Sequence, residues 1–311
     1  MMKIGFFGTP EIASYCLEHL IKHYEIAFVV TSPDKPKGRG KHLLPTPVKE
    51  KALEYGIVCF QPTTLKDEQL AETLRQFNCD IFVVVAYGKL IPRSIFSIPP
   101  LQTINLHPSL LPKYRGAAPV EWALYNGEQQ TGVTVQRINE ELDAGDIVLQ
   151  STVTIAPNET AQDVYEKILP LGADMLVRAI AGLHDGTITP VPQDHSQATY
   201  CGKITSETAR INWDIPSIHI HNMVRAFNPK PVAWTTFRGK IIKIWKTLLS
   251  DSSCNNSTAR PGTVVVQAKR LFVCTFDGTI EVMSLQPETK KPMDASAFIN
   301  GYRLQHGDAF E

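Results

Sequence analysis

Asn105 and His107 are the pair of residues whose types and spacing are best suited to chemistry. They lie two positions apart in a short apolar run, so on a strand both side chains leave the same face. Pro108 follows directly and keeps His107 extended. An imidazole that titrates near neutral pH beside an amide donor suits proton transfer and hydrogen-bond donation. We expect the pair at the carboxyl end of a strand, where open α/β sheets bind ligands.

Asp143 supplies the carboxylate that such a pair would need. It precedes another predicted strand and is followed by an Ala-Gly pair, which allows a close turn. The turn could aim the carboxylate at the imidazole of His107. An Asn-x-His pair alone is also typical of structural hydrogen bonding, so the nearby carboxylate is what favours a site. Asp146 is the competing carboxylate, and we assign it the lesser role.

The elements that position these residues alternate between strand and helix. Helical patterns follow Pro10 and the Arg-Gly pair at 115–116, and a long amphipathic segment runs from Asn158 to His184, interrupted by Pro170. Alternation predicts an α/β fold with a mostly parallel, doubly wound sheet. Continuous apolar runs predict its buried strands at 4–7, 26–30, 81–86 and 104–106, with helices at 10–21, 66–77 and 118–125.

The second half of the chain has a different pattern. Residues 190–205 indicate a linker, and 206–311 indicate a small β-barrel that follows an α/β domain at 1–189. Residues 1–189 hold 17 Lys and Arg against 21 Asp and Glu, whereas 206–311 hold 13 against 9. A basic barrel fits a polyanion partner, and the same charge also fits a solvated face. Short strand-like runs joined by turns lie at 234–237, 241–245, 262–267, 271–276 and 279–284.

Bulk properties narrow the class of protein. The formal net charge is zero, so nothing global indicates a nucleic-acid or membrane binder. The six cysteines are scattered without a Cys-x-x-Cys pair, and we expect neither a disulfide nor a zinc site. The start of the chain does not fit a signal peptide, and the apolar run 81–86 is too short to span a bilayer. We expect a cytoplasmic protein.

Two further motifs disfavour a nicotinamide cofactor and a metal ion. Gly5 and Gly8 follow a strand but do not match Gly-x-Gly-x-x-Gly, which disfavours a nicotinamide enzyme. His219 and His221 lie two apart in a predicted helix after Pro216, so their side chains diverge and do not suit a metal. We therefore predict no metal site.

Three segments resemble the signature of formyltransferases that use 10-formyltetrahydrofolate. They are Asn105-x-His107, the Ser-Leu-Leu-Pro-x-Tyr-Arg-Gly-Ala-Ala-Pro of 109–119, and the Leu-Asp-Ala-Gly-Asp of 142–146. The resemblance covers nearly the whole chain, including 8–10, 33–41, 131–134 and 224–229, and departs from the family at Glu141 and Lys230. It implies a Rossmann-like N-terminal domain, an OB-like C-terminal barrel and 10-formyltetrahydrofolate as the formyl donor.

The resemblance also implies roles for site residues. When an amine attacks a formyl carbon, negative charge gathers on the carbonyl oxygen, and Asn105 and His107 would donate hydrogen bonds to it. Asp143 would stabilise protonated His107 and accept the proton of the amine. The folate would lie against 109–112, where apolar side chains on a proline-stiffened loop suit a flat ring system. A buried loop covering the sheet has the same composition. The four residues of that stretch are Ser109, Leu110, Leu111 and Pro112.

The acceptor is open to three interpretations. Within the family, the resemblance is greatest to members that formylate methionyl initiator tRNA. Members that act on glycinamide ribonucleotide or a nucleotide amino sugar share the catalytic trio. Against a phosphoribosyl acceptor, Glu11 would oppose a phosphate at the first helix start; against an amino sugar, the long basic loop would have no purpose. A plain RNA-binding module would leave the trio unused.

The basic loop from Asp34 to Lys41 is the candidate tRNA contact. Its cations alternate with Gly and Pro in a pattern too irregular for a strand and too rich in Gly and Pro for a helix, so we expect a mobile loop. A solvated charge run would have the same composition. The resemblance assigns the loop to tRNA, with Arg39 between two glycines best placed for a bidentate contact. Its four cations are Lys35, Lys37, Arg39 and Lys41.

Overall fold

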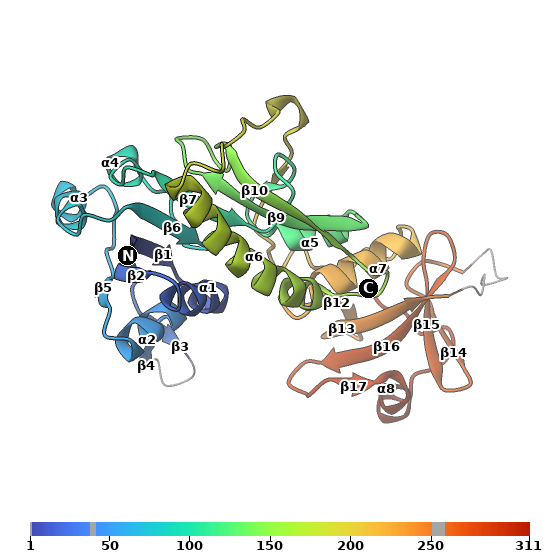
Figure 1. Cartoon of the computed structure of the whole chain (residues 1–311). Helices are drawn as coiled ribbons and strands as arrows, with labels where there is room; N and C mark the ends of the chain where they lie inside the picture. Colours follow the sequence, from blue (N-terminus) through green and yellow to red (C-terminus); the bar gives the residue numbers. More distant parts are fainter. Residues whose placement is uncertain (1, 38–41, 251–258) are drawn as a thin grey trace. The chain divides into compact units, whose positions relative to one another are not determined.

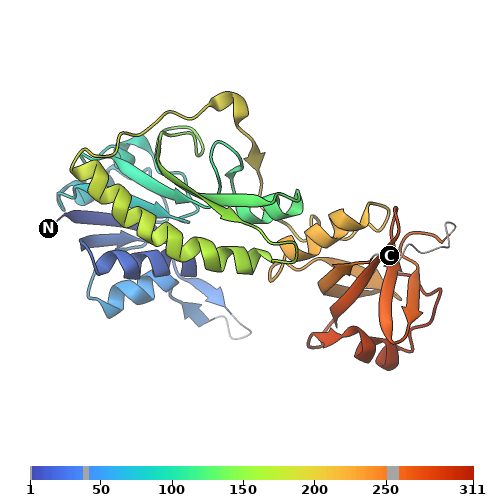
Figure 2. The ribbon, with the colours of Figure 1, turned by 45° about the vertical axis from the view of Figure 1, so that its right-hand side comes forward.

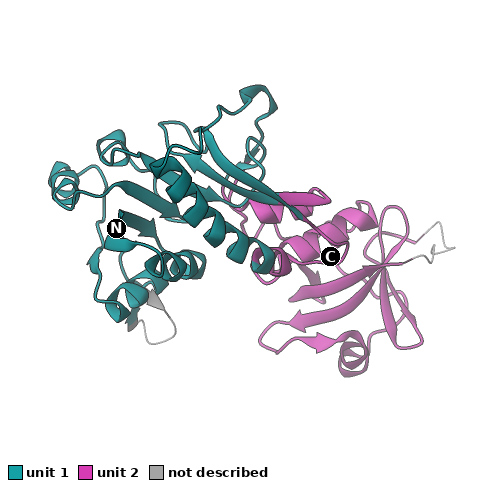
Figure 3. Cartoon of the chain, viewed as in Figure 1, with its two compact units in different colours: residues 1–116, 132–153, 166–200 teal, residues 117–131, 154–165, 201–311 magenta. Residues whose placement is uncertain are grey.

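A computed structural model describes residues 2–37, 42–250 and 259–311. The chain folds as two compact units, each assembled from several stretches of sequence (Figure 3). Unit 1 comprises Met1–Gly116, Gly132–Val153 and Glu166–Tyr200, and unit 2 comprises Ala117–Thr131, Thr154–Tyr165 and Cys201–Glu311.

Unit 1 is built on a seven-stranded sheet in the order β10-β9-β7-β6-β1-β2-β5 (Figure 1). The pairs β5–β2, β2–β1, β1–β6 and β6–β7 are parallel, and β7–β9 is antiparallel. The first strand therefore lies in the middle of the parallel part, which confirms the predicted doubly wound α/β fold. The strands are β1 Lys3–Gly8, β2 Glu25–Val30, β5 Val58–Phe60, β6 Ile81–Val85, β7 Thr103–His107, β9 Gln130–Arg137 and β10 Ile147–Thr154.

Helices cover both faces of the parallel part of this sheet (Figure 2). On one face Phe7, Phe28 and Phe82 pack edge-on or tilted in a buried cluster with residues of α3 (Glu68–Arg75) and α4 (Arg93–Phe96). On the other lie α1 (Glu11–Ile21) and α6 (Ala161–His184), joined by the 3.0 Å ion pair between His19 and Asp174. A continuous core on each side explains why the strand residues are apolar without alternation. α2 spans Pro47–Glu54.

The long helix α6 spans Ala161–His184 and corrects two expectations. It begins after Thr160 rather than Asn158, because Thr160 and Asp163 form a reciprocal cap: the Thr160 N–H donates to Asp163 Oδ2 at 2.8 Å and the Asp163 N–H to Thr160 Oγ1 at 3.3 Å. It also continues through Pro170 instead of being interrupted there. Buried side chains on both sides of the proline offset its missing hydrogen bond.

Unit 2 contains an antiparallel sheet in the order β12-β13-β16-β15-β14, with β17 paired to β16. All five predicted strands are present, which confirms an antiparallel-sheet C-terminal domain. The strands are β12 Trp234–Phe237, β13 Lys240–Leu249, β14 Val264–Gln267, β15 Arg270–Cys274, β16 Thr279–Pro287 and β17 Met293–Asp294, and the helices are α5 Pro119–Tyr125, α7 Ser217–Ala226 and α8 Ala295–Tyr302.

A buried arginine on α7 ties the separate stretches of unit 2 together. Arg225 donates to the carbonyl oxygen of Glu159 at 3.3 Å and to that of Leu124 at 3.4 Å. Its Nε also donates to Asn222 Oδ1 at 2.9 Å. Burial lowers the pKa of Arg225, yet the guanidinium keeps its charge because three acceptors face it. Arg225 thus explains why segments from the first half of the chain belong to this unit.

Replacing Arg225 by Met should destabilise the protein by about 3 kcal/mol, because buried acceptors lose a charged donor. Urea unfolding monitored by Trp fluorescence would measure the change. Arg75→Met, which removes an exposed ion pair with Glu72, should cost less than about 1 kcal/mol. Equal losses in the two variants would contradict the structural role of Arg225.

Residues 190–200 of the stretch predicted as a linker belong to unit 1 and are hydrogen-bonded to other segments of that unit. β11 (Tyr200–Cys201) pairs with β8 (Arg115–Gly116), and Val191 forms an isolated bridge with Ile147. A short 3-10 turn, η1, spans His195–Gln197. These contacts hold the stretch beside the segment that follows β7.

The basic loop forms a strand where none was expected. β3 (Lys35–Lys37) pairs with β4 (His42–Leu44) in an antiparallel hairpin. A two-stranded ribbon has only edges, so Pro36 can occupy a strand without breaking a ladder. The expectation of an irregular loop is therefore wrong for Lys35 and Lys37. Arg39 and Lys41 lie outside the described residues.

Candidate active site

β7 carries Asn105 and His107 on one face, as their spacing predicted. His107 is the last residue of the strand, and the structure therefore places the pair at its carboxyl end. His107 is buried, with 4% of its surface exposed, whereas Asn105 is half-buried. Within the part of the chain that the structure describes, the Asn105 amide makes no hydrogen bond. It is thus an available donor beside the imidazole.

The two ring nitrogens of His107 face different partners. Nε2 lies 2.9 Å from the carbonyl oxygen of Tyr114, which can only accept, so Nε2 carries a proton. Nδ1 lies 3.7 Å from Asp143 Oδ2, slightly beyond a direct hydrogen bond. Nδ1 is therefore the nitrogen that can turn toward a substrate while it stays under the influence of the carboxylate.

Asp143 is fixed by donors to both of its oxygens. The Gly116 N–H donates to Oδ2 and Gln136 Nε2 donates to Oδ1, each at 2.9 Å. Its backbone is left-handed at φ 49°, a conformation that Asp tolerates better than most residues. Two positions on, a Cβ on Gly145 would overlap the carbonyl oxygen of Arg137, so the turn requires glycine. These constraints aim one carboxylate edge at His107.

Asp146, the competing carboxylate, has a different environment. Its backbone carbonyl accepts from the Arg137 N–H at 2.9 Å. Among the described residues, its side chain makes no hydrogen bond. The geometry therefore favours Asp143 as the carboxylate that serves His107.

The stretch 109–112 follows β7 and is held by its own hydrogen bonds. Ser109 is fully buried, and its hydroxyl donates to the carbonyl oxygen of Lys113 at 2.7 Å. Leu111 is also buried, whereas Leu110 and Pro112 are half-buried. Leu110 and Pro112 therefore keep surface for a ligand, while Ser109 and Leu111 shape the loop from within.

Three polar residues near Asp143 were not expected from the sequence. Arg115 and Gln193 are buried and hydrogen-bonded to one another, and Gln136 joins them to Asp143. Arg115 lies inside the 109–119 motif, so the sequence could have identified it as a residue of the site. Gln136 and Gln193 offered none, because they approach the site only through tertiary pairing.

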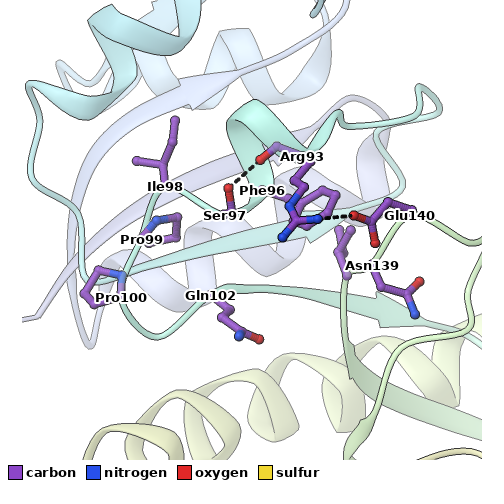
Figure 4. Close-up of a pocket in the computed structure, with 10 residues that line it drawn as sticks. Arg93, Phe96, Ser97, Ile98, Pro99, Pro100, Gln102, Asn139 and Glu140 are labelled. Atoms are coloured by element: carbon purple, nitrogen blue, oxygen red, sulfur yellow. Dashed lines mark hydrogen bonds and ion pairs between the residues drawn. The ribbon is translucent and has the colours of Figure 1, made fainter.

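A pocket of about 470 Å³ opens at the opposite end of β7 (Figure 4). Gln102, which lines it, precedes the first residue of β7, whereas His107 is the last. Arg93 and Glu140, which both line the pocket, form an ion pair with 3.3 Å between Arg93 Nη1 and Glu140 Oε1 (Figure 4). None of the predicted site residues lines this pocket. The lining residues are Arg93, Phe96, Ser97, Ile98, Pro99, Pro100, Gln102, Ile138, Asn139 and Glu140.

Metal binding has no support in the arrangement of ligand-type residues. In the described ranges, no group of three His, Cys, Asp or Glu residues could hold a metal ion. His221 is buried on α7 between Thr247 Oγ1 at 3.0 Å and the Pro157 carbonyl oxygen at 3.3 Å. Burial lowers the pKa of His221, so the ring is a neutral structural group.

The family is decided by sequence models of its two parts. A model described as formyl transferase matches residues 2–180, and one described as formyl transferase, C-terminal domain, matches residues 203–303. The chain belongs to the formyl transferase family. It is thus an enzyme of formyl transfer.

Individual relatives agree with this assignment. The chain is 44% identical over 315 residues to the methionyl-tRNA formyltransferase of Leptospira interrogans, covering 99% of this chain and 100% of that one. It is 40% identical over 311 residues to the methionyl-tRNA formyltransferase of Agathobacter rectalis, covering 99% of each. A solved N-formyltransferase from Helicobacter canadensis, complexed with folinic acid and dTDP-3-aminofucose, is similar in fold. That likeness has a TM-score of 0.66 at 22% identity and covers 92% of this chain and 100% of the other.

Among the helices in the described ranges, none combines the length and apolar character needed to cross a bilayer.

Proposed function

We propose that this formyltransferase transfers the formyl group of 10-formyltetrahydrofolate to the amino group of methionyl initiator tRNA in the cytoplasm. The observation that carries the proposal is the placement of His107: Nε2 is engaged by Tyr114, and Nδ1 lies 3.7 Å from Asp143 beside the amide of Asn105. Donors and a proton acceptor that converge on one point are what acyl transfer to an amine requires. Identity of 40% to 44% with methionyl-tRNA formyltransferases over the full chain supports the acceptor.

The chemistry assigned to each residue follows from these positions. Bound 10-formyltetrahydrofolate supplies an activated formyl carbon. As the amine attacks that carbon, Asn105 Nδ2 and His107 Nδ1 donate to the oxygen that becomes negative. Asp143 stabilises the protonated imidazole and accepts the proton that the amine loses. A new carbon–nitrogen bond forms to the amine, the bond to the donor nitrogen breaks, and that nitrogen takes up the proton.

The folate is assigned to the stretch 109–112. Leu110 and Pro112 retain accessible surface, which fits contact with a flat ring system. Ser109 contributes through its hydroxyl bond to Lys113, and buried Leu111 supports the loop. Residues 1–189 form the catalytic domain in this proposal, 190–205 the connection, and 206–311 a basic domain that binds the tRNA.

The acceptor end of the tRNA is assigned to the cations Lys35, Lys37, Arg39 and Lys41. Lys35 is exposed and lies on β3, which follows β2 in the chain. Loops that follow parallel strands lie at the ligand-binding edge of such sheets. Arg39 is proposed to make a bidentate contact with phosphate or base.

Replacing Arg39 by Ala should impair tRNA formylation and leave folate affinity unchanged. Because each phosphate contact releases counterions, the log–log dependence of tRNA binding on salt should become shallower by about one unit. Filter binding over a salt series would measure the slope. Arg75→Ala is the matched control, since Arg75 pairs with Glu72 on a surface helix, and it should keep the original slope. An unchanged slope for Arg39→Ala would remove the loop from tRNA recognition.

A small-molecule acceptor is the second candidate, because the solved structures of similar fold include the N-formyltransferase complexed with dTDP-3-aminofucose. The enzyme should be incubated with 10-formyltetrahydrofolate and, separately, methionyl initiator tRNA, glycinamide ribonucleotide and a nucleotide amino sugar. Formation of N-formylmethionine only with the tRNA supports the proposal. Faster formylation of either small amine would replace it.

A further inference from the structure

Gln193 lies in the stretch predicted as a linker, yet its side chain is buried in unit 1, with 5% of its surface exposed. Its Oε1 accepts from Arg115 Nη2 at 2.7 Å and Nε at 3.2 Å. Its Nε2 lies within donating distance of the carbonyl oxygens of Gly145, at 2.7 Å, and Asp143, at 3.0 Å. One amide thus joins the segment after β7 to the turn that carries Asp143.

A second amide extends this chain to the carboxylate itself. Gln193 Nε2 also lies 3.2 Å from Gln136 Oε1, and Gln136 Nε2 donates to Asp143 Oδ1 at 2.9 Å. The chain runs from a guanidinium that donates, through two amides that each accept at the oxygen and donate from the nitrogen, to a carboxylate that accepts. Arg115 is 1% exposed and is held further by Tyr200 Oη at 3.3 Å and His195 Nδ1 at 3.2 Å.

The chemistry of the two ends fixes the orientation of both amides. A guanidinium only donates, so Gln193 must turn its oxygen to Arg115. An ionised carboxylate only accepts, so Gln136 must turn its nitrogen to Asp143. The remaining atoms, Gln193 Nε2 and Gln136 Oε1, then meet as donor and acceptor. Each hydrogen bond therefore pairs a donor with an acceptor, and the four groups together stabilise a single conformation of the turn at 143–145.

We propose that Gln193 is a positioning residue for formyl transfer, which holds Asp143 toward His107 through Gln136 and through the backbone of 143–145. This inference rests on the role proposed for Asp143. Glutamate could not replace Gln193, because it would bind Arg115 but would set a carboxylate oxygen against two carbonyl oxygens. The essential group is therefore the donor Nε2 and not the side-chain size.

The proposal is tested with the full-length enzyme by a double-mutant cycle between Gln193→Leu and Gln136→Leu. Each single variant should lower kcat by about 100-fold, because a displaced catalytic group costs that much, while KM for folate and tRNA stays within about 2-fold. The double variant should be no slower than the slower single variant, because both changes break one chain. Gln193→Glu should be as slow as Gln193→Leu.

The control is Thr31→Val, which removes a buried 2.7 Å hydrogen bond to Thr46 in the same unit without a link to Asp143. Its kcat should stay within about 2-fold of the parent. Full activity of Gln193→Glu, multiplicative losses in the double variant, or higher KM at unchanged kcat would each overturn the proposal. If Asp143→Asn also keeps its kcat, the proposed mechanism has failed; if only the Gln193 variants keep theirs, this inference alone has failed.

Discussion

Asp143→Asn is expected to lower kcat by roughly 10³- to 10⁴-fold while the protein stays folded, because the shape survives and the charge does not. The carboxylate accepts from Gly116 at one oxygen and from Gln136 at the other. Asparagine has one oxygen, so its amide nitrogen must face one of these donors. If it faces Gln136, that amide must flip and then opposes Gln193. The loss in kcat therefore has two causes: the proton acceptor is missing, and two donors in the hydrogen-bond chain face one another.

Single-turnover kinetics with saturating folate and methionyl-tRNA would measure this step apart from product release. Asp146→Asn is the matched control, since its carboxylate has no hydrogen bond among the described residues. It should keep kcat within about 3-fold, because no hydrogen bond among the described residues links this half-buried side chain to His107 or Asp143. A larger loss for Asp146→Asn than for Asp143→Asn would reverse the assignment of the two carboxylates.

The strands of the parallel sheet could be predicted from sequence because both of their faces are buried. The runs 4–7, 26–30 and 81–86 are apolar at every position or nearly so, and short runs of this kind between helices are typical of strands covered on both faces. The strand after Asp143 was expected and is β10, whereas β9 was not predicted, because it combines buried polar residues such as Gln136 with apolar ones. Buried polar residues inside a strand interrupt the continuous apolar run that makes it recognisable.

The polar chain around Asp143 could not be read from the sequence for a different reason. Gln193 lies 78 residues from Arg115 and 57 from Gln136 along the chain. Their meeting depends on the register of β9 against β7, in which Gln136 pairs with Asn105, and on the path of 190–200. A one-residue slip in that register would turn Gln136 to the other face of the sheet. Composition alone therefore indicated a linker.

The proposed catalytic pair could be found from the sequence because the placement of its two side chains depends on local geometry alone. Asn105 and His107 share one strand and one face, so alternation and the following Pro108 sufficed. Strand β3 was not predicted, because Lys-Pro-Lys has poor strand propensity and is extended through its pairing with β4. Sequence patterns therefore predict the features that a single segment determines, such as the shared face of Asn105 and His107. Features that depend on pairing with another strand, such as β3, cannot be predicted in this way.

Asn105→Ala is expected to lower kcat by about 10²- to 10³-fold with little change in folate affinity, because its amide donates to the oxygen only as charge develops there. The structure makes this substitution a clean test. The Asn105 side chain is half-buried and has no hydrogen bond among the described residues, so its removal leaves no buried partner unsatisfied. His107→Ala should be at least as slow, but it also strips the Tyr114 carbonyl oxygen of its donor.

Thermal unfolding separates the effect of each substitution on stability from its effect on catalysis. Asn105→Ala should unfold within a few degrees of the parent, whereas His107→Ala should lose about 1–3 kcal/mol because it removes a buried side chain and its hydrogen bond to the Tyr114 carbonyl oxygen. Folate affinity from fluorescence quenching, combined with kcat from single turnovers, would then assign the loss to the chemical step. If Asn105→Ala instead raises KM at unchanged kcat, the amide binds substrate equally in ground and transition states, and His107 with Asp143 must stabilise the oxyanion without it.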